Sequence, residues 1–477
     1  MTVDVDPRWW DDASVGGQPM REVLAARDVR SVFGFLRQRG FSRSRIAALT
    51  GLSETRVRQI WQGRQQVTTY EVLERIAVGL KIPRGLLGLA YLDPTTVDDR
   101  DGAPPAGHPP LGLGWRASLR DTVEAVSDLW RADVERRSVL HQSVWLAAAA
   151  AVPARDWLLD RLDDHLAAPG ARTITHDDVQ VIWTMCQAFT DADHRLGGGH
   201  ARLALSQYVS AAVLPMLRGG YDEAVGRELM AGAARLCDLG GFMAFDSGLH
   251  GLGQRYYIQA LRLAQAAHHR GLGAHILADM SMQAQHLGDA AEAAALATAG
   301  CHTAVTTGSK ATVARCEAML ARALALASDR PGCEQAMGRA DTALERIRPD
   351  DEPAWTGFFT RDQLDTEFAY AAADLGRLDL VRRTAPAVIA ASGQMERRKV
   401  LLSATLARAC LPEAHGAHSP GCDVEQACAV LTDVAPLMVT VTTERGRQAI
   451  GTVQQQLRPY ATLPAVRHLT ELFGSME

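Results

Sequence analysis

Glycine and alanine recur through the second half of the chain at a spacing typical of stacked helices. Gly248 and Gly288 are 40 residues apart, and Gly376 follows after 88 residues, which is twice 44. Each glycine separates two stretches in which small and apolar residues have helical periodicity. Small residues let paired helices cross closely, and glycine suits the turn between them. The pattern therefore predicts a stack of helical hairpins.

Helical patterns dominate from Trp115 to the end of the chain, and strand patterns are nearly absent there. Because 477 residues are too many for one compact core, we expect an all-α fold with two or more domains, the largest over residues 115–477. Five units repeat the small-residue pattern, and they contain Cys237, Leu277, Leu320, Ala369 and Ala404. Two or three earlier pairs are expected to have tryptophans as core anchors: Trp130, Trp145, Trp157 and Trp183.

Composition excludes several classes of protein. The chain is 47% hydrophobic and 22% charged, with a net charge of −5, which is ordinary for a folded protein. It has no run of apolar residues long enough to span a bilayer and no apolar core of a signal peptide, so we expect no membrane association and a cytoplasmic location. The eight cysteines are scattered and form no CxxC pair, which predicts reduced thiols and no metal site.

Motifs of catalysis are also missing. The stretch "GLHGLG" at residues 248–253 follows no strand, and "GSK" at 308–310 lacks the upstream glycine of a phosphate loop. No nucleophile elbow or zinc-protease motif occurs. We therefore expect no enzymatic activity and no cofactor.

Charge is distributed unevenly along the chain. Residues 27–91 contain 12 basic and 4 acidic side chains, whereas the remaining residues contain 38 basic and 51 acidic side chains. A segment of charge +8 in an otherwise acidic chain indicates a polyanionic partner at this end. The alternative is an ordinary solvated surface.

The basic segment is expected to form five short helices. Ser42 and Ser53 stand where helix caps belong, and Gly51 between them allows a tight turn. The helices are expected over residues 28–39, from Ser42 to Gly51, over 54–62, from Thr68 with its capping partner Glu71 to Leu80, and from Pro83 to Leu87. On the third helix, one arc should face the core and the opposite arc should face solvent; the inner arc holds Val57, Ile60 and Trp61.

The stretches "RGFSRSRIAALTGLSETRVRQIWQG" and "YEVLERIAVGLKIP" resemble the lambda-repressor-like, or XRE-type, helix-turn-helix domain over about 65 residues. The resemblance implies a DNA-binding domain at residues 27–92. Many relatives have Gln where this chain has Arg43, and Glu where it has Trp61. These departures leave the target DNA sequence open.

In that family the N-terminal half of the third helix enters the major groove. By this resemblance, Gln59 would bond an adenine edge, and Arg58 would bond guanine or hold a phosphate. The candidate DNA-contacting residues are Arg43, Ser53, Glu54, Thr55, Arg56, Arg58, Gln59 and Arg64. The plainer interpretation of each arginine is an exposed surface charge.

Two segments flank the basic domain. Residues 1–26 are expected to be a flexible tail, in which Trp9 and Trp10 either dock on the body or contact a partner. Residues 93–114 are rich in Pro, Gly and Asp and predict a semi-rigid linker.

A polar and aromatic cluster, "GQRYYIQALR", is the candidate for a ligand-binding wall. The concave side of a helical array commonly binds peptides, proteins or small molecules. The candidate residues are Asp246, Arg255, Tyr257, Gln259 and Arg262. In the alternative interpretation, Tyr256 or Tyr257 packs in the core and Arg255 forms a salt bridge with Asp246.

The helical array resembles degenerate tetratricopeptide (TPR) repeats, although its period exceeds 34 and the Trp and Pro signature positions are missing. Only three of the 50 basic residues are lysine, a bias typical of a GC-rich genome. The whole chain thus resembles actinobacterial XRE-type regulators with a TPR-like C-terminal domain, which are similar in architecture to peptide-responsive quorum-sensing regulators.

The resemblance implies a homodimeric repressor that binds an inverted-repeat operator in double-stranded DNA and controls differentiation or secondary metabolism. A peptide, small-molecule or protein effector would bind the array. Two alternatives remain open: a protein-interaction adaptor with weak nucleic-acid affinity, and a toxin–antitoxin or phage-type repressor.

Overall fold

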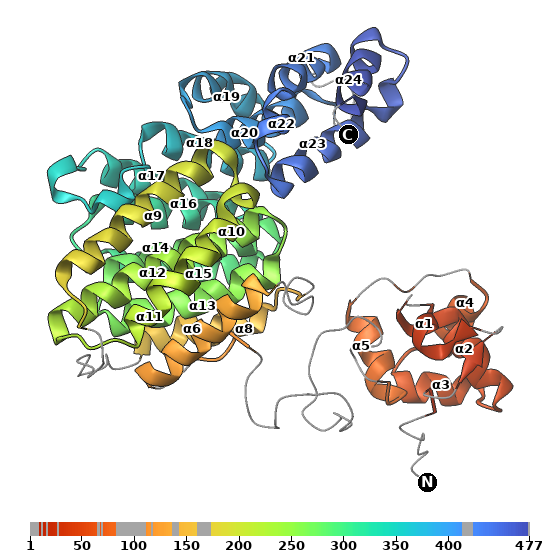
Figure 1. Ribbon diagram of the computed structural model, residues 1–477. Helices are drawn as coiled ribbons and strands as arrows, with labels where there is room; N and C mark the ends of the chain where they lie inside the picture. Colours follow the sequence, from red (N-terminus) through yellow and green to blue (C-terminus); the bar gives the residue numbers. More distant parts are fainter. Residues whose placement is uncertain are drawn as a thin grey trace. The chain divides into compact units, whose positions relative to one another are not determined.

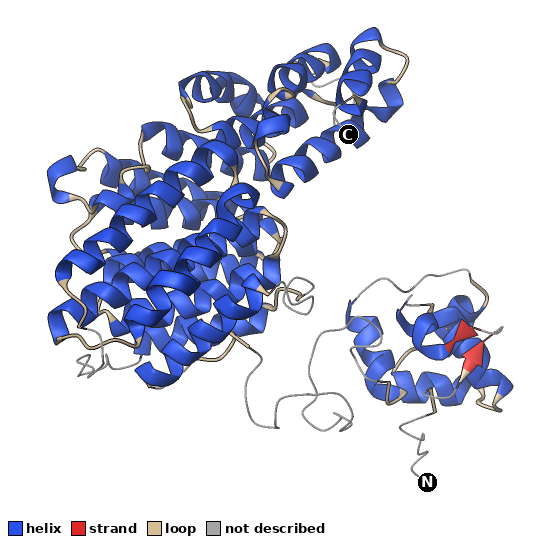
Figure 2. Ribbon diagram, in the orientation of Figure 1, coloured by secondary structure: helices blue, strands red, loops and turns tan. Residues whose placement is uncertain are grey.

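The computed structural model divides into two compact units, residues 1–108 and 109–477 (Figure 1). The structure describes residues 9–10, 13–15, 18–25, 28–63, 67, 70–82, 111–115, 118–135, 143–159, 173–412 and 423–475. These residues are almost entirely helical, which confirms the all-α prediction (Figure 2). The described strands are β1 (Ser14–Val15) and β2 (Gln18–Pro19), which pair antiparallel.

The small unit has helices α1 (Met20–Ala25), α2 (Val29–Gln38), α3 (Arg43–Thr50), α4 (Glu54–Trp61) and α5 (Tyr70–Gly79). The predicted caps are confirmed, since the Ser42 hydroxyl accepts the Arg45 N–H at 3.1 Å and the Ser53 hydroxyl accepts the Arg56 N–H at 3.3 Å. Gly51 adopts the left-handed φ of 65° that ends α3. The predicted Thr68 cap and the fifth helix after Pro83 lie outside the described residues.

The prediction of a flexible tail is wrong for the described part of residues 1–26. Met20 and Leu24 of α1 are fully buried, and the Trp9 indole donates to Leu80 O at 2.8 Å and stacks on Phe35. Trp9 therefore docks on the body, as one of the two alternatives held. The segment is too short to reveal a helical period, and its apolar residues find their burial only against helices later in the chain.

The backbones of α3 and α5 are in close contact at Gly79. A Cβ added there would lie 1.8 Å from the Leu49 carbonyl oxygen, a distance that no real structure tolerates. Ala47 of α3 is also buried, but the backbone contact that requires glycine is at Gly79 of α5.

Replacing Gly79 with alanine should therefore destabilise the small unit by about 1–3 kcal/mol, because α5 must move away from α3. Hydrogen exchange of the full-length protein should show lost protection in both helices. Gly34→Ala is the matched control: Gly34 is also inside a helix, its added Cβ would meet nothing closer than 3.9 Å, and stability should rise slightly. Equal behaviour of the two variants would contradict the assigned contact.

The large unit begins with α6 (Leu119–Val134), α8 (Ala147–Leu159), α9 (His176–Leu196) and α10 (Gly198–Tyr208), then η2 (Val209–Val213) and α11 (Leu214–Leu217). Five helical pairs follow: α12 (Glu223–Asp246) with α13 (His250–Ala266), α14 (Arg270–His286) with α15 (Ala290–Ala304), α16 (Lys310–Leu326) with α17 (Arg330–Leu344), α18 (Arg361–Asp374) with α19 (Leu378–Ala391), and α20 (Glu396–Cys410) with α21 (Val424–Val434). Short turns η3 (Pro349–Asp351) and η4 (Ala354–Thr356) precede α18, and α22 (Leu437–Thr440), α23 (Glu444–Leu457), η5 (Arg458–Tyr460) and α24 (Pro464–Gly474) complete the chain.

The predicted turn glycines are confirmed. Gly248 and Gly288 both have φ of 79°, Gly376 has φ of 70°, and each lies between the two helices of a pair. Ser328, with φ of 61°, takes the same place between α16 and α17, 40 residues after Gly288. Because the turn residue of this pair is a serine, a search for glycines alone misses this repeat.

The predicted core tryptophans lie where they were expected. Trp130 and Trp157 are buried, and Trp145 and Trp183 are partly buried against the same core. The seven cysteines within the described ranges are buried, and no disulfide joins them. Among those ranges, no helix combines the length and the apolar character needed to span a bilayer.

Candidate functional site

The first candidate site is the outer face of α4 in the small unit. Val57 and Ile60 are each 1% exposed, so they fix this helix against the core, as the periodicity predicts. Trp61 is partly buried, with the Arg37 guanidinium 4.1 Å from its ring centre. The opposite side of α4 therefore faces outward.

That outward side carries most of the predicted DNA-contacting residues. Arg43 at the start of α3 is also exposed, and Arg56 is half-buried. The exposed residues at and within α4 are Ser53, Glu54, Thr55, Arg58 and Gln59. Within the described ranges no ion pair is found for Arg43 or Arg58. Arg64, the last candidate, lies outside those ranges.

The second candidate site is a cavity of about 550 Å³ in the large unit. It lies among the first helices of the pairs, α12, α14, α16, α18 and α20, with α9 and α23 also contributing. We call it the arginine cavity, because its walls include Arg235, Arg315, Arg322, Arg397, Arg398, Arg408 and Arg445.

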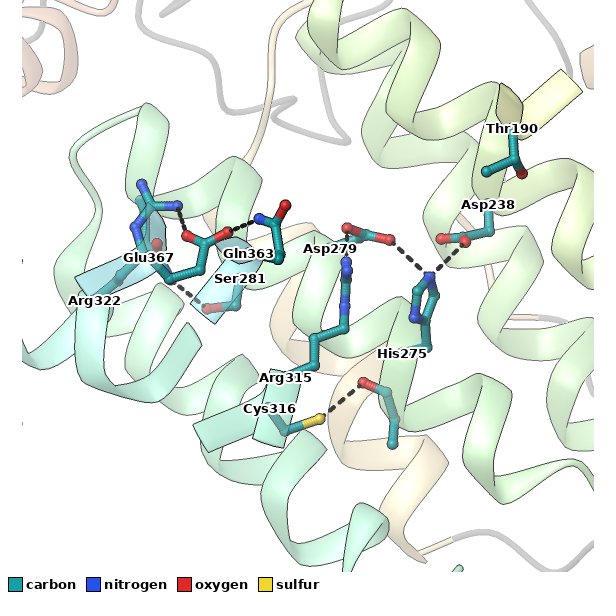
Figure 3. Close-up of polar contacts among 12 residues, drawn as sticks. Thr190, Asp238, His275, Asp279, Ser281, Arg315, Cys316, Arg322, Gln363 and Glu367 are labelled. Carbon is teal, nitrogen blue, oxygen red and sulfur yellow. Dashed lines mark hydrogen bonds and ion pairs between the residues drawn. The ribbon is translucent and has the colours of Figure 1, made fainter. Parts of the chain in front are cut away.

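One wall of the cavity is an ion network around His275 (Figure 3). Arg235 Nη1 donates to Asp238 Oδ2 at 2.5 Å and lies 3.2 Å from His275 Nε2. Asp279 pairs with Arg315 and places its Oδ2 3.4 Å from the same His275 Nε2. Burial, and then Arg315, hold the pKa of His275 well below its usual range, so the ring is neutral at neutral pH.

Three residues of this network, Asp238, His275 and Asp279, are of types that bind metal ions, but positively charged arginines contact all three. The ligand atoms of Asp238, His275 and Asp279 lie within 4.8 Å of one another. However, the Arg235 guanidinium contacts two of these three side chains, and Arg315 contacts the third. Two guanidinium groups already neutralise the carboxylates and repel a cation. The geometry therefore opposes a divalent metal here.

A second network is centred on Asp246, which is fully buried at the end of α12. Its Oδ1 accepts from Arg445 Nε at 2.9 Å and from the Thr443 hydroxyl at 3.0 Å, and its Oδ2 accepts the Gly198 N–H at 3.0 Å. Arg397 Nη1 lies 3.8 Å from Oδ2. Burial alone would raise the pKa of Asp246. Arg397, Arg445 and the hydrogen bonds together lower this pKa by more than burial raises it, so the net shift is downward.

A third network joins α16, α18 and α20. Arg322 Nη1 donates to Glu367 Oε2 at 2.8 Å, and the Gln363 amide donates to Glu367 Oε1 at 2.6 Å (Figure 3). Gln363 Oε1 in turn accepts from Arg398 Nη2 at 2.7 Å. Arg398 thus meets a neutral oxygen where the other buried arginines of the cavity meet carboxylates.

The ligand wall predicted on α13 has partners within the chain. Arg255 Nε donates to Leu111 O at 2.9 Å, and Gln259 Nε2 donates to Gly112 O at 2.8 Å. Tyr257 is fully buried, and Arg262 lies over the Trp115 ring. None of these four side chains lines the arginine cavity.

Two related expectations are corrected by these contacts. The salt bridge between Arg255 and Asp246 is wrong, because Asp246 pairs with Arg445 and Arg255 bonds backbone carbonyls. The linker does not extend to residue 114, because residues 111–114 are bonded to α13. The alternative that Tyr256 and Tyr257 pack in the core is confirmed, with both fully buried. Helix α13 is the second helix of its pair and is covered by α6 and α8, which the sequence did not indicate.

Sequence reasoning missed the arginine cavity, although a signal was present. Arg235, His275 and Arg315 are spaced by 40 residues, the same interval that separates Gly248, Gly288 and Ser328. A search for the 40-residue repeat among polar residues, and not among glycines alone, would have identified the face of α12, α14 and α16 that lines the cavity.

Comparison with known protein families, with curated proteins and with solved structures finds no match to this chain. The function is therefore inferred from the geometry of the two candidate sites and from the resemblance of the sequence motifs.

Asp246→Asn should destabilise the large unit by about 3–5 kcal/mol, because it leaves buried guanidinium charge without its carboxylate. Urea unfolding of the full-length protein, followed by circular dichroism, measures the loss. The control is Glu223→Gln, which breaks a half-exposed pair with Arg227 and should cost less than about 1 kcal/mol. A similar cost for the two variants would show that the buried network contributes little.

The burial of His194 among arginines predicts that the protein loses stability on mild acidification. Burial, followed by Arg397 and Arg235, lowers its pKa to about 3 from an ordinary 6.5. Between these values the unfolded chain binds more protons, so the free energy of unfolding rises with pH by at most about 1.4 kcal/mol per unit. The melting temperature should fall between about pH 7.5 and about pH 5.5, and less steeply in His194→Gln. Parallel curves for the two proteins would contradict this assignment.

Proposed function

We propose that the protein is a sequence-specific transcription regulator that reads DNA with the outer face of α4. The observation that carries the proposal is the exposure of Thr55, Arg58 and Gln59 on a capped helix whose other side is fixed in the core. Arg and Gln side chains on such a helix match the donor and acceptor pattern of the major groove.

Charge supports the same proposal. The segment that contains α4 has a net charge of +8 in a chain of net charge −5. Arg43 and Arg58 are exposed, so both are available to phosphates. Binding through such contacts releases counterions and should weaken steeply as salt rises.

The finer architecture belongs to this proposal. The order α3, Gly51 turn, α4 supports a helix-turn-helix of the XRE type, and the five helical pairs, four of which have a left-handed residue in their described turn, support a TPR-like array. In the proposed regulator the small unit binds the operator as a homodimer, usually to repress transcription, and the large unit senses a peptide, small-molecule or protein signal. A dimer is expected because a single helix buries little surface on DNA.

Selection of bound sequences from random duplex DNA tests the proposal with the full-length protein. Wild type should enrich an inverted repeat. Arg58→Ala combined with Gln59→Ala should weaken binding to it about 100-fold, since each bidentate base contact contributes about 1–3 kcal/mol.

The chain offers a matched control in Gln38→Ala combined with Arg39→Ala. These two residues have the same side-chain types and are exposed, but they lie at the end of α2. This variant should keep the selected motif. If wild type enriches no motif, or if the α4 variant retains it, the regulator proposal fails and a protein-interaction adaptor becomes the better description.

A further inference from the structure

We propose that the arginine cavity binds a small anionic molecule whose carboxylate or phosphate group is held by Arg398. The inference deepens the proposed sensing role and rests on that role for its biological meaning. Its test measures ligand binding alone, so failure of this inference and failure of DNA recognition can be told apart.

The first step is the balance of charge in the cavity wall. Five of the seven arginines pair with buried carboxylates; these pairs are Arg235 with Asp238, Arg315 with Asp279, Arg322 with Glu367, Arg397 with Asp193, and Arg445 with Asp246. No carboxylate pairs with Arg398 or Arg408 within the part of the chain that the structure describes. The wall therefore has two arginines in excess of its ion-paired carboxylates, which suits a mono- or dianion.

Arg398 is the buried member of that excess pair. It is 9% exposed, and its Nη2 donates only to the neutral Gln363 amide oxygen. Its Nε is buried and has no acceptor among the described residues. A buried cation without an anion is costly, and a guanidinium binds carboxylate or phosphate oxygens through two parallel hydrogen bonds. A bound anion would fill the empty acceptor position and neutralise the charge.

The surroundings of Arg398 fit the rest of such a molecule. His194 and Phe358 line the cavity and also a neighbouring hollow of about 420 Å³, and Arg398 lines both. The His194 ring lies 5.9 Å from the Phe358 ring, so a hydrogen-bonding imidazole and an apolar face stand together. Met395 also lines both spaces. The ligand is thus expected to have an apolar body beside its charged group.

Size and charge argue against a large polyanion. A cavity of about 550 Å³ matches the range of about 300–1,000 Å³ typical of small-molecule sites. The carboxylates in the same wall, such as Asp193 and Glu367, would repel additional negative groups. A single anionic group that reaches Arg398 avoids this repulsion.

Two dyes of nearly the same shape provide the first test. Anilinonaphthalene sulfonate has an aromatic body and one negative charge, and N-phenylnaphthylamine is its uncharged counterpart. Fluorescence titration of the full-length protein should show saturable binding of the sulfonate at one site. Inorganic phosphate or hexanoate should displace the sulfonate, and whichever competes better identifies the group that the site prefers.

Substitutions at Arg398 then assign the site. Arg398→Gln should weaken sulfonate binding at least about tenfold and leave binding of the neutral dye unchanged, whereas Arg398→Lys should retain part of the affinity because it keeps the charge. Arg383→Gln is the matched control, since Arg383 is exposed on α19, the second helix of its pair. Circular dichroism and urea unfolding check that each variant is folded.

Other outcomes would overturn the proposal. Equal affinity for the two dyes would mean that the cavity selects apolar bodies only. Sulfonate binding that Arg398→Gln leaves unchanged would place the anion elsewhere. If Arg398→Gln does not fold, the lysine variant and the competition experiment still decide, because inorganic phosphate, which has no apolar part, should not displace the sulfonate from a site that does not select anions.

Discussion

The large unit depends on one buried carboxylate, Asp246, which holds together segments that are far apart in the sequence. Its oxygens bond Gly198, Thr443 and Arg445, so the start of α10, the end of α12 and the start of α23 meet at one point. Such a contact is expensive to break, because the remaining guanidinium would be buried without an anion. Asp246 therefore fixes how the last helices close against the first ones and helps to form the arginine cavity.

Three consecutive glycines make this closure possible. Added Cβ atoms at Gly197 and Gly199 would lie 2.6 Å from Thr442, and one at Gly198 would lie 2.7 Å from Met243 O. The backbones bond directly, with Thr442 N–H donating to Leu196 O at 2.8 Å. Any side chain here would separate Asp246 from its partners. The ion network therefore requires the "GGG" stretch for close packing, and not for flexibility of a loop.

Local features of the fold could be predicted from the sequence, because their causes are local. Ser42 and Ser53 cap helices through their own hydroxyls, Gly248 and Gly288 form turns, and Val57 lies inward because of its place in the helical period. The outward position of Arg58 and Gln59 follows from the same period.

The cavity could not be predicted in this way. Whether the first or the second helix of each pair faces the cavity is decided by distant contacts, such as α6 and α8 covering α13. The polar residues of α13 looked like a ligand wall, yet Arg255 and Gln259 bond the backbone of residues 111–114. In the sequence, a buried arginine that bonds its own chain cannot be told from one that awaits a ligand.

These contacts also bear on how a bound anion could influence the proposed DNA binding. A ligand shifts an equilibrium only as far as its affinity differs between two arrangements of the protein. Arg398 and Gln363 belong to α20 and α18, and their hydrogen bond crosses between neighbouring pairs. An anion that draws the Arg398 guanidinium away from Gln363 would exchange a neutral hydrogen bond for an ionic one and change the spacing of those pairs.

Residues 111–114, which lead to the small unit, are bonded to α13, and α13 packs on α12 and α14, whose inner faces line the same cavity. Residues 111–114 are thus joined to the cavity wall through the packing of α13 on α12 and α14.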